Sequence, residues 1–209
     1  APYGGFNVVI GNDGGTYAGV TYLPSSVLIP NRWYHVILAW NTGTNTITGY
    51  LNGSLAFNTS HSLWPTTMPS VAIGNGFSAA RYWQGKMDEV RIYNRTLSAQ
   101  EAMTLYSQGA LTIGHTQTDK ITSGLIGMWS FNGSDMNWTG ASSGTAYDRS
   151  GNNNHATFVN MNQKTSVVPG VSGQAVLFNG TSSYVEVQNS ASLNPSNLTD
   201  RKSTRLNSS

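Results

Sequence analysis

Apolar and polar residues alternate along much of the first half of the chain, with the period of two that is typical of β-strands. Residues 32–40, with the sequence RWYHVILAW, form the longest such run, and a turn-rich loop follows them. The chain then returns over residues 46–51 to Asn52-Gly53, a dipeptide that favours the two-residue turn of a β-hairpin. Residues 54–57 are the expected partner strand, so this half of the chain predicts antiparallel hairpins.

Two further strands are expected over residues 71–74 and 85–93. Adjacent side chains of a regular strand point to opposite faces of the sheet. We therefore expect Asp88 and Glu89, in the longer of these strands, to face in opposite directions.

The signature of a helix start follows. Ser98 and Glu101 have the spacing of a capping box, in which each side chain bonds the backbone amide of the other residue. This predicts one short helix near 99–106. Residues 107–123 are weakly patterned and are expected to form a linker.

A second β-rich region begins at residue 124. Strand-like segments occupy residues 124–131, 175–178 and 184–187, and a long polar loop that includes residues 148–155 lies between the first two. The whole chain thus predicts an all-β fold with many short strands.

The last ten residues, 200–209, have the sequence DRKSTRLNSS, which resembles the translation of a common sequencing adapter. We expect this segment to be an artefact and disordered; the alternative is a natural polar tail. It contributes three basic residues and one acidic residue to a formal net charge of +2, so the rest of the chain is neutral. The basic charge balance is therefore no reason to expect a nucleic-acid partner.

Composition narrows the compartment and the chemistry. The chain has no cysteine, which excludes disulfides, thiol catalysis and cysteine-based zinc sites. No apolar run approaches the roughly 20 residues that span a bilayer, so no membrane insertion is expected. The first residues show no signal peptide, and we expect the true N-terminus to be missing. A secreted or cell-surface protein of a microbe fits these features.

Several motifs resemble a laminin-G-like domain of the concanavalin A-like lectin/glucanase jelly-roll family. Motifs in the first half resemble the C-terminal part of such a domain: NRWYHV at 31–36, GYLNG at 49–53 and GKMDEVRIYNRTLS at 85–98. Motifs in the second half resemble its N-terminal part: GLIGMWSF at 124–131, DRSGNNNHAT at 148–157 and the segment 173–187.

The resemblance implies an antiparallel jelly-roll β-sandwich, with its two parts in reversed order. Residues 1–106 would be the C-terminal half of one domain, residues 107–123 the linker and residues 124–199 the N-terminal half of the following domain. Neighbouring laminin-G-like domains are then expected in the parent chain. As a corollary, we hypothesise that the isolated chain pairs its two halves into a single, circularly permuted sandwich, which requires residues 124–131 to lie beside residues 85–93.

Catalysis is not expected. The resemblance brings in glucanases, which carry paired carboxylates as nucleophile and general acid. The glutamates of this chain are Glu89, Glu101 and Glu186. Glu101 fits the helix cap, Glu186 is isolated, and Glu89 is expected to face away from Asp88. We therefore predict no catalytic residues and no enzyme.

A structural calcium ion is one candidate ligand, because calcium prefers carboxylate, amide and backbone oxygens. The resemblance places such a site near the first and last strands, where its ligands would be Asp88, Asp148, Asn152 and Asn154. The alternative is that the loop residues close Asx-turns and that Asp88 binds a backbone amide.

Carbohydrate is another candidate ligand, because sugars stack on aromatic side chains. Trp64, Tyr82, Trp83 and Trp138 lie in polar, loop-like sequence and are the candidate ligand-binding residues. For each of them the alternative is plain packing against the edge of the sandwich. Asn-X-Ser/Thr sequons also occur, as at Asn58 and Asn137, and indicate surface loops if the source organism glycosylates.

These observations favour a non-catalytic recognition or adhesion module of a secreted or cell-surface protein. Its partner would be carbohydrate or an extracellular protein, and structural calcium is the one cofactor considered. A purely structural spacer in a surface stalk is the alternative. The third hypothesis is an accessory domain of a polysaccharide-degrading enzyme.

Overall fold

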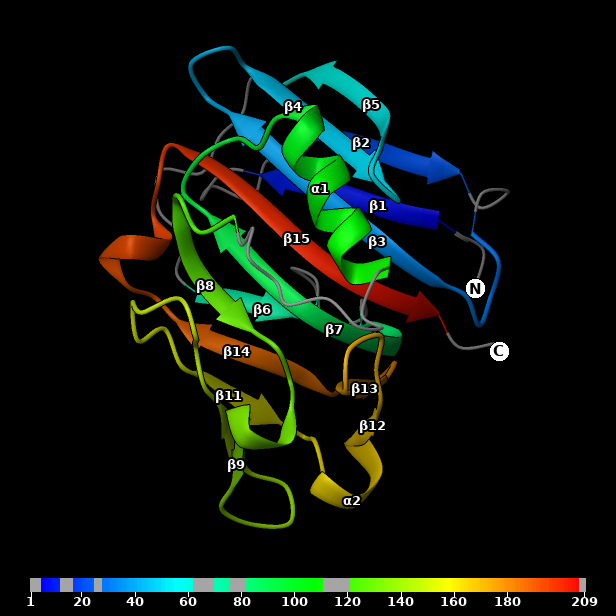
Figure 1. Ribbon diagram of the computed structural model, residues 1–209, viewed down its shortest axis with the longest axis vertical. Coiled ribbons are helices and arrows are strands. Elements are labelled where there is room, and N and C mark those ends of the chain that lie inside the picture. The colour runs from blue at the N-terminus through cyan, green and yellow to red at the C-terminus, as the bar shows by residue number, and fades with distance from the viewer. Residues whose placement is uncertain are drawn as a thin grey trace.

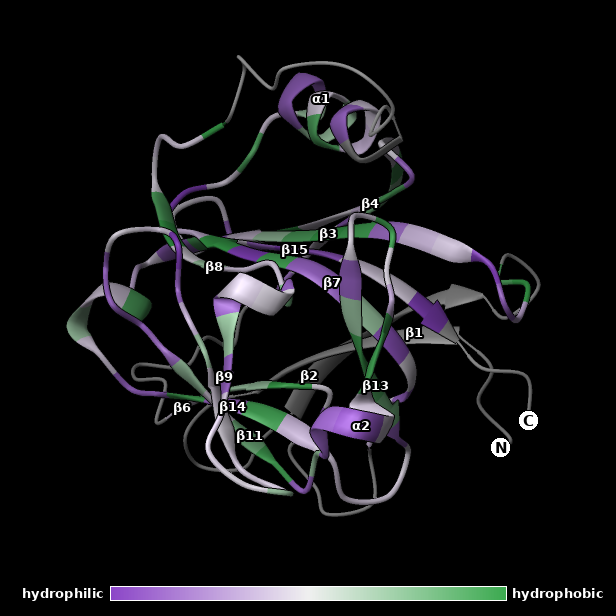
Figure 2. Ribbon diagram, turned by 60° about the horizontal axis from the view of Figure 1, so that its bottom comes forward, coloured by the Kyte–Doolittle hydropathy of each residue, from purple (hydrophilic) through white to green (hydrophobic). Residues whose placement is uncertain are grey.

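The computed structural model describes residues 5–11, 17–24, 28–61, 70–75, 82–110 and 121–206. Strands dominate these residues and form an eight-stranded, a five-stranded and a two-stranded sheet, in which every pair of neighbours is antiparallel. The two larger sheets form the layers of a sandwich, with a helix on the outer face of the larger one (Figures 1 and 2). The all-β sandwich expected from the sequence is confirmed.

The first half of the chain supplies seven strands and the main helix. They are β1 (Gly5–Gly11), β2 (Tyr17–Pro24), β3 (Trp33–Asn41), β4 (Thr46–Leu51), β5 (Ser54–Ser60), β6 (Ser70–Ile73), β7 (Gln84–Tyr93) and α1 (Ala99–Ala110).

The second half supplies shorter strands and small helical turns. They are β8 (Leu125–Trp129), η2 (Gly133–Asp135), β9 (Met136–Trp138), β10 (Gly144–Ala146), β11 (Ala156–Val159), α2 (Gln163–Ser166), β12 (Val167–Pro169), β13 (Gln174–Asn179), β14 (Tyr184–Gln188), η3 (Ala191–Leu193) and β15 (Asn197–Leu206).

The two halves of the chain are interleaved in both sheets. The larger sheet has the order β12-β13-β7-β15-β3-β4-β5, and β8 also pairs with β7. The smaller sheet has the order β6-β14-β11-β10-β9. In particular, Val90 lies opposite Trp129, and Ile92 lies opposite Gly127. The two halves therefore pair into one sandwich, as hypothesised for the isolated chain.

The tail has the opposite structure to the one expected. Residues 200–206 are not disordered but belong to β15, which lies between β3 and β7 (Figure 1). Without β15, the facing backbone groups of β3 and β7 would have no partner, and unpaired buried amides and carbonyls are costly. Backbone pairing thus places a polar segment in the centre of the sheet. The adapter-like origin of the segment stays a prediction.

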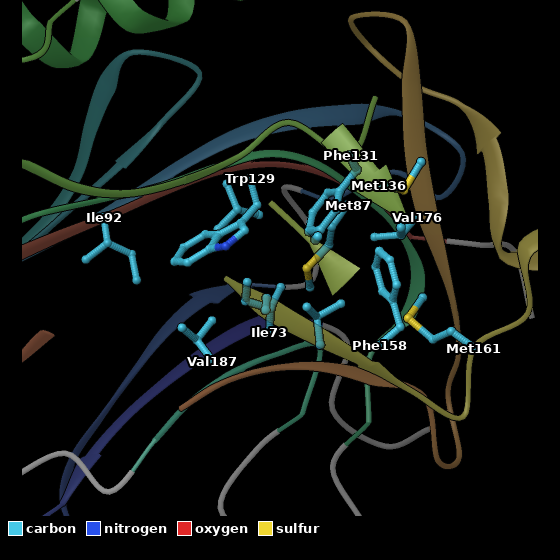
Figure 3. Packing of buried hydrophobic residues seen from close by; sticks show 14 of the residues in the cluster. Ile73, Met87, Ile92, Trp129, Phe131, Met136, Phe158, Met161, Val176 and Val187 are labelled. Atoms are coloured by element: carbon cyan, nitrogen blue, oxygen red, sulfur yellow. The ribbon is translucent and has the colours of Figure 1, made fainter. Parts of the chain in front are cut away.

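A large apolar core fills the space between the two sheets (Figure 3). Trp129 and Phe131 are among its largest members and are fully shielded from solvent. The Trp129 indole donates a hydrogen bond of 3.0 Å to the carbonyl of Asn154. A Cβ on Gly127 would lie 2.4 Å from the Trp129 ring, so only glycine leaves room for this indole. The core fixes β8 against the rest of the sandwich.

The outer face of the larger sheet is covered by α1 (Figure 2). Leu105 and Ala102 of the helix pack with Ile37, Tyr50 and Tyr93 of the sheet. The capping box is confirmed: the Glu101 amide donates to the Ser98 hydroxyl, and the Ser98 amide donates to the Glu101 carboxylate. The helix continues to residue 110, one turn further than the sequence predicted.

We expect replacement of one inward-facing charge pair to stabilise the fold. Asp200 and Lys202 follow the core residue Leu198 on the same face of β15, and they pair with each other while remaining 24% exposed. In the double variant Asp200→Val/Lys202→Val, apolar contacts with the neighbouring strands replace this ion pair, which should raise the free energy of unfolding by about 1–3 kcal/mol. Urea unfolding measures it.

The single variants are the controls. Asp200→Val and Lys202→Val each leave one partly buried charge without its partner, so each should be less stable than the double variant. Equal stabilities of all four proteins would show that the pair is effectively solvated.

Candidate functional site

A β-bulge in β7 brings two carboxylates to one face of the sheet. Arg91 lies opposite Arg201 and Asp88 lies opposite Ser203, so β7 has one residue more than β15 in this interval. Glu89 has φ +54°, a left-handed conformation that is uncommon for a residue with a side chain. The expected strict alternation, with Asp88 and Glu89 on opposite faces, is therefore wrong.

Glu89 forms ion pairs with two arginines, Arg91 and Arg201, on this face of the sheet. Its carboxylate is 2.8 Å from Arg91 and 3.8 Å from Arg201, and Arg201 is 2% exposed. The Nε of Arg201 donates to Nε2 of His35 at 2.9 Å. Burial, with the nearby charges of Arg201 and Arg91, lowers the pKa of His35 to about 3. The histidine is therefore a neutral acceptor at physiological pH.

Asp88 is fully buried beside this cluster. One of its oxygens accepts hydrogen bonds from the backbone amides of Val171 and Ser172, at 2.8 and 3.0 Å, while the other has no hydrogen-bond partner among the described residues. Burial, with a smaller contribution from the charge of Glu89, raises the pKa of Asp88 to about 7, although the backbone amide hydrogen bonds act to lower it. Asp88 thus holds the turn between β12 and β13 against β7, as the backbone-amide interpretation proposed.

This arrangement changes the argument about catalysis. Two neighbouring carboxyls with different environments are what a glycoside hydrolase uses. Here, however, Asp88 is 0% exposed, and the Glu89 side chain is 13% exposed and already bound to arginines. A glycosidic bond cannot reach Asp88 in this conformation. The sequence predicted that the two carboxyls are kept apart on opposite faces of the strand. In the structure they share one face, and their burial keeps them from a substrate.

Asp148 organises the polar loop that follows β10. One oxygen accepts from the amides of Met128 and Ser150, and the other accepts from the Ser150 hydroxyl and the Asn154 amide. A carboxylate has about four acceptor positions, so these bonds fill it. The loop is therefore tied to β8 by the carboxylate.

The other candidate calcium ligands do not complete one oxygen set. Asn154 accepts from the Ser190 hydroxyl at 2.7 Å, and Asn152 is exposed and donates to the Leu125 carbonyl. The hydrogen bonds of Asp88 run to the β12–β13 turn, whereas those of Asp148, Asn152 and Asn154 stay around their own loop, β8 and the segment near η3. Within the described ranges, no group of three histidine or acidic residues could hold a metal. The geometry supports the Asx-turn interpretation, and calcium binding stays a prediction.

The candidate aromatic residues are also separated. Trp64 lies outside the described residues. Trp83 packs against the main core, and Trp138 stacks on Phe158 with ring centroids 4.4 Å apart. Tyr82 bridges Asn75 just beyond β6, whereas Trp138 belongs to β9 at the opposite edge of the smaller sheet. Of the three described residues, Tyr82 alone is partly exposed without belonging to the core cluster.

The sequence analysis missed Arg91, Arg201 and His35. An alternating pattern gave Arg91 and His35 ordinary strand positions, and Arg201 was assigned to the disordered tail. One signal in the sequence could have indicated them: charged residues cluster between Asp88 and Arg91, in a strand that lies in the centre of the sheet. Charges buried there need partners of opposite charge.

The comparisons with known proteins agree with the sandwich and its motifs. Residues 2–103 match a laminin-G-type family model described as the concanavalin A-like lectin/glucanases superfamily. The first half of this chain is therefore similar to that superfamily. The match ends before β8, and the sheet pairing described above joins the second half of the chain to the matched segment. Neither a curated protein nor a solved structure matches the chain. In the described part of this protein, no helix is long and apolar enough to cross a bilayer.

We expect Asp148→Asn to destabilise the protein without any effect of calcium. The new amide group replaces an oxygen that accepts two hydrogen bonds, so the free energy of unfolding should fall by about 1–3 kcal/mol. Thermal unfolding in calcium and in chelator measures the loss, which should be equal in both. Asn152→Ala is the exposed control in the same loop. A loss confined to the calcium buffer would instead identify Asp148 as a metal ligand.

We expect the advantage of an Asp88→Asn variant over the wild type to grow with pH. The pKa of Asp88 is 3.8 in the unfolded chain and about 7 in the folded protein, so the folded state retains the proton between these values. This carboxyl therefore stabilises the fold at low pH and loses that contribution as pH rises towards about 7. Asparagine keeps the acceptor for both amides and does not titrate.

Urea unfolding at pH 4, 5.5 and 7 tests this difference. The free energy of unfolding of Asp88→Asn, relative to the wild type, should increase along this series. A constant difference would mean that Asp88 titrates alike in both states.

Proposed function

We propose that this chain is a non-catalytic recognition module of a secreted or cell-surface protein, and that it binds carbohydrate or an extracellular protein. The observation that carries the proposal is the burial of its paired carboxyls. Asp88 is held by two backbone amides and Glu89 by two arginines, so neither is presented to a substrate. The similarity of residues 2–103 to a superfamily of lectins and glucanases then favours the lectin-like role.

Binding is expected at the loop side chains that the core leaves unused. Trp83 and Trp138 pack against the core and are less suited to a ligand than Tyr82. Tyr82 is partly exposed at the isolated bridge beyond β6. We infer that Tyr82 contributes an aromatic surface for a sugar ring or a protein side chain, with Trp64 as a second candidate.

A glycan array probed with the whole chain, in calcium and in chelator, tests the proposal. We expect binding to at least one glycan class, and Tyr82→Ala should weaken it about tenfold, the scale of an interface residue worth 1–2 kcal/mol. Tyr184→Ala is the matched control, because Tyr184 is a partly exposed tyrosine on β14. Equal losses in the two variants would remove Tyr82 from the binding surface.

Two other results would redirect the proposal. Silence on the array and towards extracellular proteins would favour the structural spacer. Release of reducing sugars from a polysaccharide, abolished in Glu89→Gln, would show that the buried carboxyls open to substrate and that the protein is an enzyme.

A further inference from the structure

Among the described strands, β5 and β9 lie at edges of the two larger sheets. Strand β5 pairs on one side with β4, and β9 pairs on one side with β10. Neither strand contains a charged residue or a proline, the residues with which proteins commonly block such edges. Six of the seven residues of β5 are exposed, and Leu55 among them is 60% exposed.

Both of these edge strands carry an exposed glycosylation sequon. Asn58-Thr59-Ser60 lies within β5, and Asn137-Trp138-Thr139 starts in β9. Asn58 and Asn137 are exposed, and none of the hydrogen bonds found in the described part of the chain involves either carboxamide.

Most of the other described sequon asparagines are engaged in the fold. Four of them accept backbone amide hydrogen bonds, namely Asn52, Asn132, Asn179 and Asn197. Asn94 is the exception: it is exposed, but it follows the end of β7 and does not lie on an edge strand. The structure therefore separates the two edge sequons from the four whose asparagines accept backbone hydrogen bonds.

We propose that Asn58 and Asn137 are acceptor sites for N-linked glycans, and that the glycan on Asn58 shields the free edge of β5. The donor is a lipid-diphosphate-linked oligosaccharide. The carboxamide Nδ2 forms a bond to C1 of the sugar and loses a proton to a base of the transferase. The bond between C1 and the diphosphate breaks, and the lipid diphosphate leaves with its electron pair.

The shielding follows from distance. An added strand must approach β5 to about 4.8 Å along its whole length for its backbone hydrogen bonds to form. A glycan is bulky and well hydrated, and on Asn58 it would stand within two residues of the end of the strand. It would thus supply at this edge the protection that charged residues give elsewhere.

Secretion of the whole chain from a glycosylating yeast tests the acceptor sites. Enzymatic removal of N-glycans in heavy-oxygen water converts each modified asparagine to a labelled aspartate, which peptide mass spectrometry locates. We expect labels at Asn58 and Asn137, and loss of one glycan mass in each of Asn58→Gln, Ser60→Ala and Asn137→Gln. Asn179→Gln is the control and should leave the mass of the attached glycans unchanged. Absence of label at both edge sites, or equal labelling at Asn132 and Asn179, would overturn the assignment.

Light scattering on the secreted proteins tests the shielding. Ser60→Ala removes the sequon but keeps Asn58, so it should associate at least severalfold more than the glycosylated wild type. Adding Ala56→Lys to that variant places a charge on the bare edge and should restore the monomer. A Ser60→Ala protein as monomeric as the glycosylated one would overturn the shielding role, whatever the occupancy of Asn58.

Discussion

The pairing of β7 with three other strands is the constraint on which this structure depends. Along one edge, β7 pairs with β15; along the other, it pairs first with β13 through residues 84–87 and then with β8 through residues 90–93. The bulge at Glu89 falls in the interval where one neighbour gives way to the next. Both halves of the chain are therefore anchored to one strand, and neither sheet is complete without both.

The same interval explains the buried charges. Because the bulge turns Asp88, Glu89 and Arg91 to the face of the sheet that α1 partly covers, their charges must be satisfied within the protein. Arg91 and Arg201 neutralise Glu89, and burial keeps His35 uncharged. Replacing one member of such a cluster usually costs more than the pair contributes, since the remaining charge stays buried. A buried cluster of this kind is therefore suited to fixing the register between β7 and β15, and not to reacting with a substrate at the surface.

Much of the fold could be predicted from the sequence, because strand alternation, the Asn52-Gly53 turn and the Ser98/Glu101 cap are local signals. The bulge could not, since a left-handed glutamate has no local signature and an extra residue shows only when two strands are aligned. The prediction of a disordered tail was wrong for a related reason. The polar sequence of β15 is not typical of a central strand, but its backbone pairs with β3 on one side and β7 on the other. At the candidate site, Trp138 lies in polar sequence. Its stacking on Phe158 could not be predicted, because this contact joins residues that are distant in sequence.

The central position of β15 has a consequence for how the protein is made. Asn41 pairs with Asn197, and Tyr93 pairs with Thr199, so the middle of the larger sheet closes over separations of more than a hundred residues. During synthesis, β3 and β7 leave the ribosome long before β15, which pairs with both of them. Until β15 is made, their facing backbone groups are exposed to water. Such long-range closure is slow, and a translational pause before residue 197 would prolong the exposure of two open strands to chaperones and to one another.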